Sequence, residues 1–254
     1  MQTERYIRSR SANLADRLNA DLDSIKGLVV AVFAGLILMF LGLRALPVDN
    51  TPLLAKVMCL LSLTIATAGV GAYVGRRLVG WLPAIGLLIL SVIGMFIIRS
   101  AGGGLMASSL LVGWGFINGM MLGPFIAMVV EEEGPGIVLQ ALTGTTAVML
   151  GTGIFAMVSG IDFSFLGPML LIGLIGLVVV GLVGIFVRFS RTVNLVYSVI
   201  GMLVFSGYFL YHFFRLSKSE NTWEQAVSTT ISLYLSFANF FMYLLQFLLA
   251  SRRR

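Results

Sequence analysis

Long apolar runs alternate with short polar breaks along most of this chain. Eight runs have about 20 residues or more, the length that a helix needs to cross ~30 Å of hydrocarbon. They cover residues 27–46, 53–75, 79–98, 105–129, 137–158, 166–187, 193–214 and 226–249. Because the breaks are short, consecutive helices are predicted to be antiparallel neighbours. The pattern predicts an all-α polytopic membrane protein with eight spans.

The last two runs differ from the others because polar residues recur on one helical face of each. The polar face of the final run consists of Ser232, Ser236, Asn239, Tyr243 and Gln246. The matching face of the run before it consists of Asn194, Ser198, Gly201, Tyr208 and His212. An unpaired polar group in lipid costs free energy, so both faces are predicted to turn inward. The last hairpin is therefore predicted to be the hub of the bundle.

Composition supports a membrane protein and excludes an ordinary soluble domain. Hydrophobic residues make up 58% of the chain and charged residues 11%, whereas soluble domains carry about 25% charge. The net charge of +6 comes from Lys and Arg at helix ends and termini, so it does not indicate nucleic-acid binding. The partner that composition does imply is the lipid bilayer.

The distribution of positive charge predicts the orientation. The side that holds both termini carries 12 Lys and Arg, and the opposite side carries 5. Cytoplasmic segments collect such residues, so both termini are predicted to lie in the cytoplasm, as in a bacterial inner membrane. Residues 1–26 form a polar leader, which is interpreted either as an amphipathic surface helix or as a frayed cytoplasmic tail.

Glycines recur at spacings that suit close packing between membrane helices. Gly115, Gly119 and Gly123 follow one face of the fourth run, and Gly71 and Gly75 do the same in the second. Small residues at four-residue intervals let two helices approach until their backbones touch. These glycines are predicted to form packing seams.

Catalytic and cofactor motifs are missing from the sequence. The chain has one histidine, His212, and one cysteine, Cys59, too few for a zinc site, and no serine lies in a nucleophile motif. Nothing resembles a nucleotide-binding loop, so the prediction is a protein that is not an enzyme and has no cofactor or metal. His212 is either an interfacial residue or a titratable group that faces Ser236 on the next helix.

Several stretches together resemble one known family. They are Lys56–Gly75, Gly113–Ala127, Gln140–Met157, Asp162–Leu170, Val204–Leu216 and Ala226–Leu248. In this order they are similar to the transmembrane Bax inhibitor motif family, especially its bacterial YccA-like branch. The resemblance implies a seven-helix bundle around a central last helix over residues 53–250. The run at 27–46 is then an extra N-terminal helix, which inverts the core or contradicts the charge count.

The resemblance also bears on function. Calcium-leak members carry an aspartate pair on the last two helices, and His212 and Ser236 stand at the matching positions here. An imidazole and a hydroxyl cannot replace a carboxylate pair as hard-cation ligands. The YccA-like branch implies a modulator of a membrane quality-control protease of the FtsH type. A pH-sensitive calcium or proton leak through Tyr208, His212, Ser232, Ser236 and Asn239 is the alternative, and a stress-response protein without transport is a third.

Overall fold

The computed structural model describes residues 51–187 and 189–252. The predicted leader at 1–26 and the predicted helix at 27–46 lie outside these residues. The described chain is helical, and its helices are α2 (Leu53–Gly75), α3 (Trp81–Ser100), α4 (Gly104–Glu133), α5 (Pro135–Val158), α6 (Leu166–Phe186), α7 (Arg191–Lys218) and α8 (Trp223–Arg252). Seven described helices are long and apolar enough to cross a bilayer, which confirms the seven spans predicted from residue 53 onward.

The ends of several helices extend past the predicted apolar runs. The predicted span at 193–214 becomes α7, which continues to Lys218, and the span at 226–249 becomes α8, which begins at Trp223. The added residues are largely polar, and charged side chains at helix ends reach the aqueous interface while the backbone remains helical. At 1.5 Å per residue, the 30 residues of α8 span about 45 Å, well beyond the hydrocarbon thickness.

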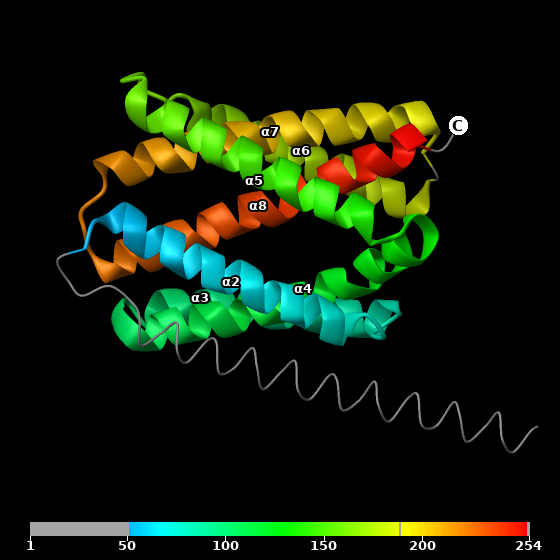
Figure 1. The fold of residues 1–254 in the computed structure, drawn as a ribbon, viewed down its shortest axis with the longest axis horizontal. Helices are drawn as coiled ribbons and strands as arrows, with labels where there is room; N and C mark the ends of the chain where they lie inside the picture. Colours follow the sequence, from blue (N-terminus) through cyan, green and yellow to red (C-terminus); the bar gives the residue numbers. More distant parts are fainter. Residues whose placement is uncertain (1–50, 188, 253–254) are drawn as a thin grey trace, which may run out of the picture.

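The helices form two groups on either side of α8 (Figure 1). Helix α4 packs against α2 and α3, and α7 packs against α5 and α6. Helix α8 runs between the two groups and contacts α2, α3, α4, α5 and α7. Ile231, Leu233 and Tyr234 of α8 are almost completely buried. The last helix therefore lies inside the bundle rather than at its edge.

Helices α3 and α6 lie at the outside of the bundle and expose most of their apolar side chains. Leu88, Ile89 and Phe96 of α3 are exposed, as are Ile172 and Val179 of α6. Exposed apolar surface of this extent suits a helix that faces lipid, since hydrocarbon is as apolar as the side chains. Their sequences are apolar on all sides for this reason.

The five glycines predicted to pack helices together all lie at the contact between α2 and α4. A Cβ atom at Gly119 would overlap the carbonyl of Ala68, and one at Gly123 would overlap the carbonyl of Ala72. On the opposite helix, a Cβ at Gly71 or Gly75 would overlap backbone atoms of α4, and Gly115 faces Thr64. The two backbones touch, which no residue larger than glycine permits.

The Gly75 contact lies beside a proline inside α4. Pro124 lies inside α4 and has no N–H to donate to the carbonyl of Met120, four residues earlier. Gly75 of α2 packs against that same carbonyl. The carbonyl that Pro124 leaves without its helical donor therefore faces the backbone of α2 at the glycine contact.

We expect Gly119→Ala to destabilise the protein because the new methyl group forces α2 and α4 apart. Overpacking of this kind costs about 1–3 kcal/mol. The measurement is the thermal unfolding midpoint of the full chain in detergent micelles. The matched control is Gly113→Ala on the same helix, where the added Cβ meets nothing within 4 Å. Equal midpoints for the two variants would contradict the close contact.

Candidate functional site: the polar face of the last hairpin

The turn between α7 and α8 is held by side chains on both of its ends. Thr222 accepts the backbone N–H of Gln225 with its hydroxyl at 3.2 Å, which caps the first turn of α8. The Gln225 amide donates to the hydroxyl of Ser219 at 3.0 Å. Asn221 donates to the carbonyl of Thr51 at 2.9 Å, which ties the turn to the segment before α2. These contacts set the position of α7 against α8.

A small polar cavity lies directly inside this turn. Its volume is about 40 Å³, enough for a few water molecules. Three lining residues belong to α7 and its end, and four to the first turns of α8. They are His212, Arg215, Ser219, Gln225, Ser228, Thr229 and Ser232. The single histidine therefore sits near the end of its span, as the interfacial interpretation predicts, and also on the polar face of the hairpin.

Of the candidate residues, the structure brings three together at this cavity. His212 and Ser232 line it, and the ring of Tyr208 stacks on the His212 ring with centroids 5.6 Å apart. Ser236 lies one turn deeper along α8 and does not line the cavity. Ser232, Ser228 and Thr229 are therefore the hydroxyl residues of α8 that share the cavity with His212, and the pairing of His212 with Ser236 stays a prediction.

The serines of α8 are hydrogen-bonded within their own helix. The Ser236 hydroxyl donates to the carbonyl of Ser232 at 2.9 Å, and the Ser232 hydroxyl donates to the carbonyl of Ser228 at 3.2 Å. Ser236 is buried, so this local bond satisfies its proton where water is scarce. Their oxygens remain available as acceptors only.

Asn239 does not follow the prediction that the whole polar face turns inward. Its side chain is exposed, and its amide donates to the carbonyl of Leu235 at 2.8 Å. Asn194 at the start of α7 is also exposed. The prediction for these two residues is wrong, because a hydrogen bond within the helix lets an amide face outward at lower cost, and Asn194 lies near a helix end.

Below Ser236 the interface between α7 and α8 is closed by aromatic rings. Phe209 packs against Phe240 with centroids 5.8 Å apart, and Phe209 is fully buried. One turn further, Phe205 stacks on Tyr243, whose ring also fills the space beside Gly201. The polar cavity therefore ends at the aromatic layer and does not continue along the hairpin.

A tyrosine pair follows the aromatic layer. The Tyr197 hydroxyl donates to the carbonyl of Leu177 on α6 at 2.9 Å and lies 3.1 Å from the Tyr243 hydroxyl. Since Tyr197 has one proton and gives it to Leu177, Tyr243 donates to the Tyr197 oxygen. The pair ties α6, α7 and α8 together with hydrogen bonds inside the membrane.

Sequence reasoning missed a second buried polar network, between α3 and α4. Ser91 donates to the Asn118 side-chain oxygen at 3.0 Å, and Asn118 donates to the carbonyl of Trp114 at 2.8 Å. The Trp114 indole completes the ring by donating to the carbonyl of Ser91 at 2.8 Å. Ser91 and Asn118 are isolated polar residues in apolar runs, so no repeating pattern marks them. Only the pairing of the two helices reveals them.

The acidic residues of the described chain lie at helix ends rather than in the bundle interior. Residues 131–133, all glutamates, end α4, Glu220 and Glu224 flank the last turn, and Asp162 lies between α5 and α6. Asp162 accepts the N–H of Ser164 at 2.8 Å, and this hydrogen bond lowers the pKa of its carboxyl. Among the described residues, no group of three His, Cys, Asp or Glu side chains is placed to hold a metal ion.

A comparison with known protein families shows to which family this chain belongs. The profile of the family described as "Inhibitor of apoptosis-promoting Bax1" matches residues 50–254. The chain belongs to this family. Bax inhibitor family proteins are generally non-enzymatic membrane proteins. The residues matched begin just before α2, so the family core comprises the seven described spans.

Similar Bax inhibitor family proteins come from bacteria, viruses and animals. An uncharacterized membrane protein of Vibrio cholerae is 35% identical over 208 residues, which cover 79% of this chain and 90% of the relative. The Golgi anti-apoptotic protein of vaccinia virus (strain Lister) is 39% identical over 129 residues, 51% of this chain and 54% of the relative. Mouse protein lifeguard 4 is 36% identical over 129 residues, 51% of this chain and 53% of the relative.

We expect Tyr197→Phe to lower the free energy of unfolding by about 0.5–1.5 kcal/mol, the usual contribution of a hydrogen bond. The variant removes the bond to Leu177 and leaves the Tyr243 hydroxyl without its acceptor. Unfolding in detergent micelles gives the measurement. Tyr73→Phe on α2 is the matched control, because Tyr73 is 41% exposed and surface changes of this kind stay within about 0.5 kcal/mol. A loss no greater than the control's would argue against the tyrosine pair.

Proposed function

We propose that this Bax inhibitor family protein modulates a membrane-anchored quality-control protease of the FtsH type. The observation that carries this proposal is the closed interior of the last hairpin. Aromatic rings seal it beyond Ser236, and the described acids lie outside the bundle. A hairpin closed in this way argues against conduction of ions and favours a function through contacts with other proteins. The resemblance to the YccA-like branch supports a protease as that partner.

The outer surface of the bundle offers room for a partner helix. Helices α3 and α6 present apolar faces, and α6 carries Gly176 with open space beside its Cα. Helices in lipid associate through van der Waals packing at small residues rather than through the hydrophobic effect. A partner that docks on either face would displace lipid without exposing any polar group of this chain.

Positive charge supports a cytoplasmic position for the C-terminal end of the bundle. The end of α8 lies beside Arg191, which donates to the carbonyls of Ala250 and Ser251 at 2.8 and 3.2 Å. The ends of α2 and α4 lie at the same side, together with Arg76 and Arg77. The His212 cavity then faces the opposite side of the membrane. If residues 27–46 cross the bilayer, the leader at 1–26 returns to the cytoplasm, where a protease domain can reach it.

The protease proposal predicts co-purification. We expect the full chain, tagged at its C-terminus, to recover a co-expressed FtsH-type protease from membranes solubilised in mild detergent. Deletion of residues 1–26 should reduce the recovery if the leader is presented to the protease, and should leave it unchanged if the contact lies within the membrane. The control is an unrelated polytopic protein expressed at the same level. No association in either form refutes the proposal.

A pH-sensitive cation or proton leak is the second candidate, and the polar cavity favours it. His212 is an imidazole beside Arg215 and three hydroxyl side chains, Ser228, Thr229 and Ser232. Protonation of His212 would place a second positive charge beside Arg215 and weaken the packing of α7 against α8 at this end. A leak also requires the Phe209–Phe240 contact to separate.

The leak candidate predicts pH-dependent flux in proteoliposomes. We expect His212→Ala to abolish the pH dependence of proton or calcium flux, because no other imidazole exists in the chain. Asn239→Ala is the matched control, since Asn239 is exposed and lies outside the cavity. Flux that is absent, or that keeps its pH dependence in His212→Ala, removes this candidate.

A further inference from the structure

An apolar cavity of about 270 Å³ lies between α2, α4, α5 and α8. Helices α2 and α5 each contact α4 and α8, but they do not contact each other. Residues of α4 and α8 form the base of the cavity between them. On the α2 side the lining includes three small residues, Ala68, Gly69 and Ala72, which leave the cavity wide. Its volume is close to the lower end of the range for small-molecule sites, about 300–1,000 Å³.

The cavity opens sideways toward the lipid. Gly69 on α2 and Leu142 on α5 stand at its two edges, and both are exposed. Of the residues that the structure describes, Tyr234 is the one with a polar side chain that lines it. A molecule that enters here therefore comes from the hydrocarbon layer rather than from water.

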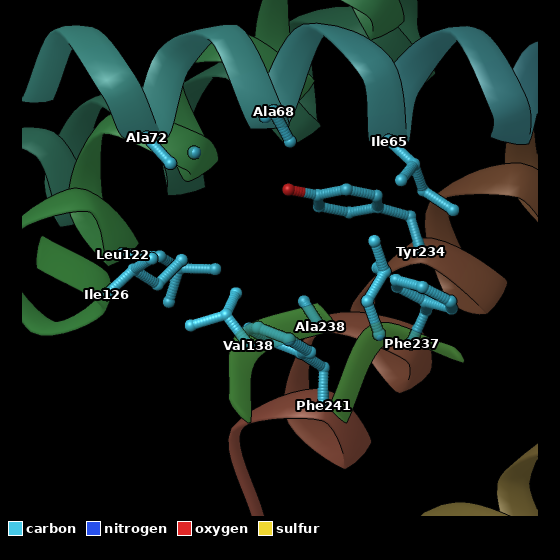
Figure 2. A pocket seen from close by; sticks show the side chains of 13 residues that line it. Ile65, Ala68, Ala72, Leu122, Ile126, Val138, Tyr234, Phe237, Ala238 and Phe241 are labelled. Atoms are coloured by element: carbon cyan, nitrogen blue, oxygen red, sulfur yellow. The ribbon is translucent and has the colours of Figure 1, made fainter. Parts of the chain in front are cut away.

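Tyr234 is the polar feature of this cavity. Its side chain is 2% exposed, and its hydroxyl has no hydrogen-bond partner among the described residues. Figure 2 shows the hydroxyl pointing into the space beside Ala68 and Ala72. The ring is held edge-on against Trp114, with centroids 5.3 Å apart. A buried polar group without a partner costs about 1–3 kcal/mol, so a native structure that keeps one calls for a reason.

The depth of Tyr234 restricts what could pair with it. It lies 11 residues after the start of α8 at Trp223 and 18 before the end at Arg252, about 16 Å and 27 Å along the helix axis. Since α8 exceeds the ~30 Å hydrocarbon layer by about 15 Å, an equal excess at its two ends places Tyr234 about 9 Å inside the nearer surface, below the headgroups and their ester groups. Water needs two to four polar partners, and the described lining of the cavity offers it one hydroxyl.

We propose that this cavity binds a lipid-soluble carbonyl compound, which enters between α2 and α5 and accepts a hydrogen bond from the Tyr234 hydroxyl. The apolar walls hold the body of the molecule, and the phenol, a good donor, selects an acceptor oxygen. Binding satisfies the hydroxyl without any movement of the helices. This site is separate from the polar cavity at His212 and does not depend on the protease or leak proposals.

Trp114 provides a reporter for the test because it touches Tyr234. The chain has three tryptophans, so replacing Trp81 and Trp223 with Phe leaves Trp114 alone. The full chain carrying these two changes is placed in phosphatidylcholine nanodiscs and titrated with 2-decyl-1,4-benzoquinone. A quinone quenches tryptophan fluorescence, and a bound quinone gives a saturable component above the linear quenching from the lipid.

Two variants and one control locate the probe. Gly69→Leu fills the cavity, and the added Cβ itself meets nothing within 4 Å. Tyr234→Phe removes the hydroxyl. Gly86→Leu on α3 is the matched control, since Gly86 is also open and does not line the cavity. All variants are first compared by their thermal midpoints, and Tyr234→Phe is expected to be at least as stable as its parent because it removes an unpaired group.

We expect saturable quenching in the parent and in Gly86→Leu. Binding of the probe should be at least tenfold weaker in Gly69→Leu. In Tyr234→Phe it should be about three- to tenfold weaker, as the loss of one hydrogen bond implies. Two competitors that do not quench tryptophan are compared. Decylbenzene, which lacks a carbonyl, should compete more weakly than a dialkyl ketone of similar size. No saturable component in the parent overturns the proposal. So does equal binding by Gly69→Leu, which puts the probe elsewhere, or by Tyr234→Phe, which means that the hydroxyl selects nothing.

Discussion

The structure depends on one constraint, which is that polar groups inside hydrocarbon must find partners within the protein. Hydroxyl groups satisfy this constraint by donating hydrogen bonds to carbonyls of their own helix. Thr64, Thr145 and Thr230 do so at donor–acceptor distances of 2.7 to 2.8 Å. Larger polar groups need a second helix, as in the Asn118 network and the Tyr197–Tyr243 pair. The constraint also applies to α8, which lies between the two groups of helices and there buries Thr230, Ser236 and the side chain of Tyr234.

Close packing of α2 against α4 has consequences beyond stability. The two helices meet backbone to backbone at Gly71, Gly75 and Gly119, so α2 is drawn toward α4 and away from α5. The small residues that allow this approach continue around α2 from Ala68, which meets Gly119 of α4, to Gly69, where an added Cβ would meet nothing within 4 Å. The same composition that closes one face of α2 thus opens a cavity on the next. Glycine seams in membrane helices create space as well as remove it.

The sequence predicts the helices well because lipid imposes a simple rule of length and polarity. Each predicted span from residue 53 onward corresponds to a helix, and the glycine faces lie where their spacing indicates. Helix phase alone does not decide which polar residues are buried. Asn239 shares its face with Ser236, yet it is exposed, because an amide can bond to its own helix and leave the interior.

Isolated polar residues are where prediction from the sequence fails. Asn118, Ser91 and Tyr234 form no repeating pattern, and their roles depend on which helices meet. Tyr234 is on α8 but lies off the predicted polar face, since it is two residues from Ser232 and Ser236. A search for repeating polar residues along a helix does not detect a single tyrosine. Tyr234 is nevertheless the one described residue of the cavity lining with a polar side chain.

The turn end and the middle of the last hairpin differ in polarity and packing. Near the turn, hydroxyls and an imidazole surround a cavity that can hold water, while the middle is closed by Phe209 and Phe240. Gly153 of α5 packs against the ring of Phe213, so α7 cannot rotate to open the layer without displacing α5 as well. Any route through the aromatic layer would therefore require α5 to move together with α7. This packing makes ion passage the more demanding of the two proposed functions.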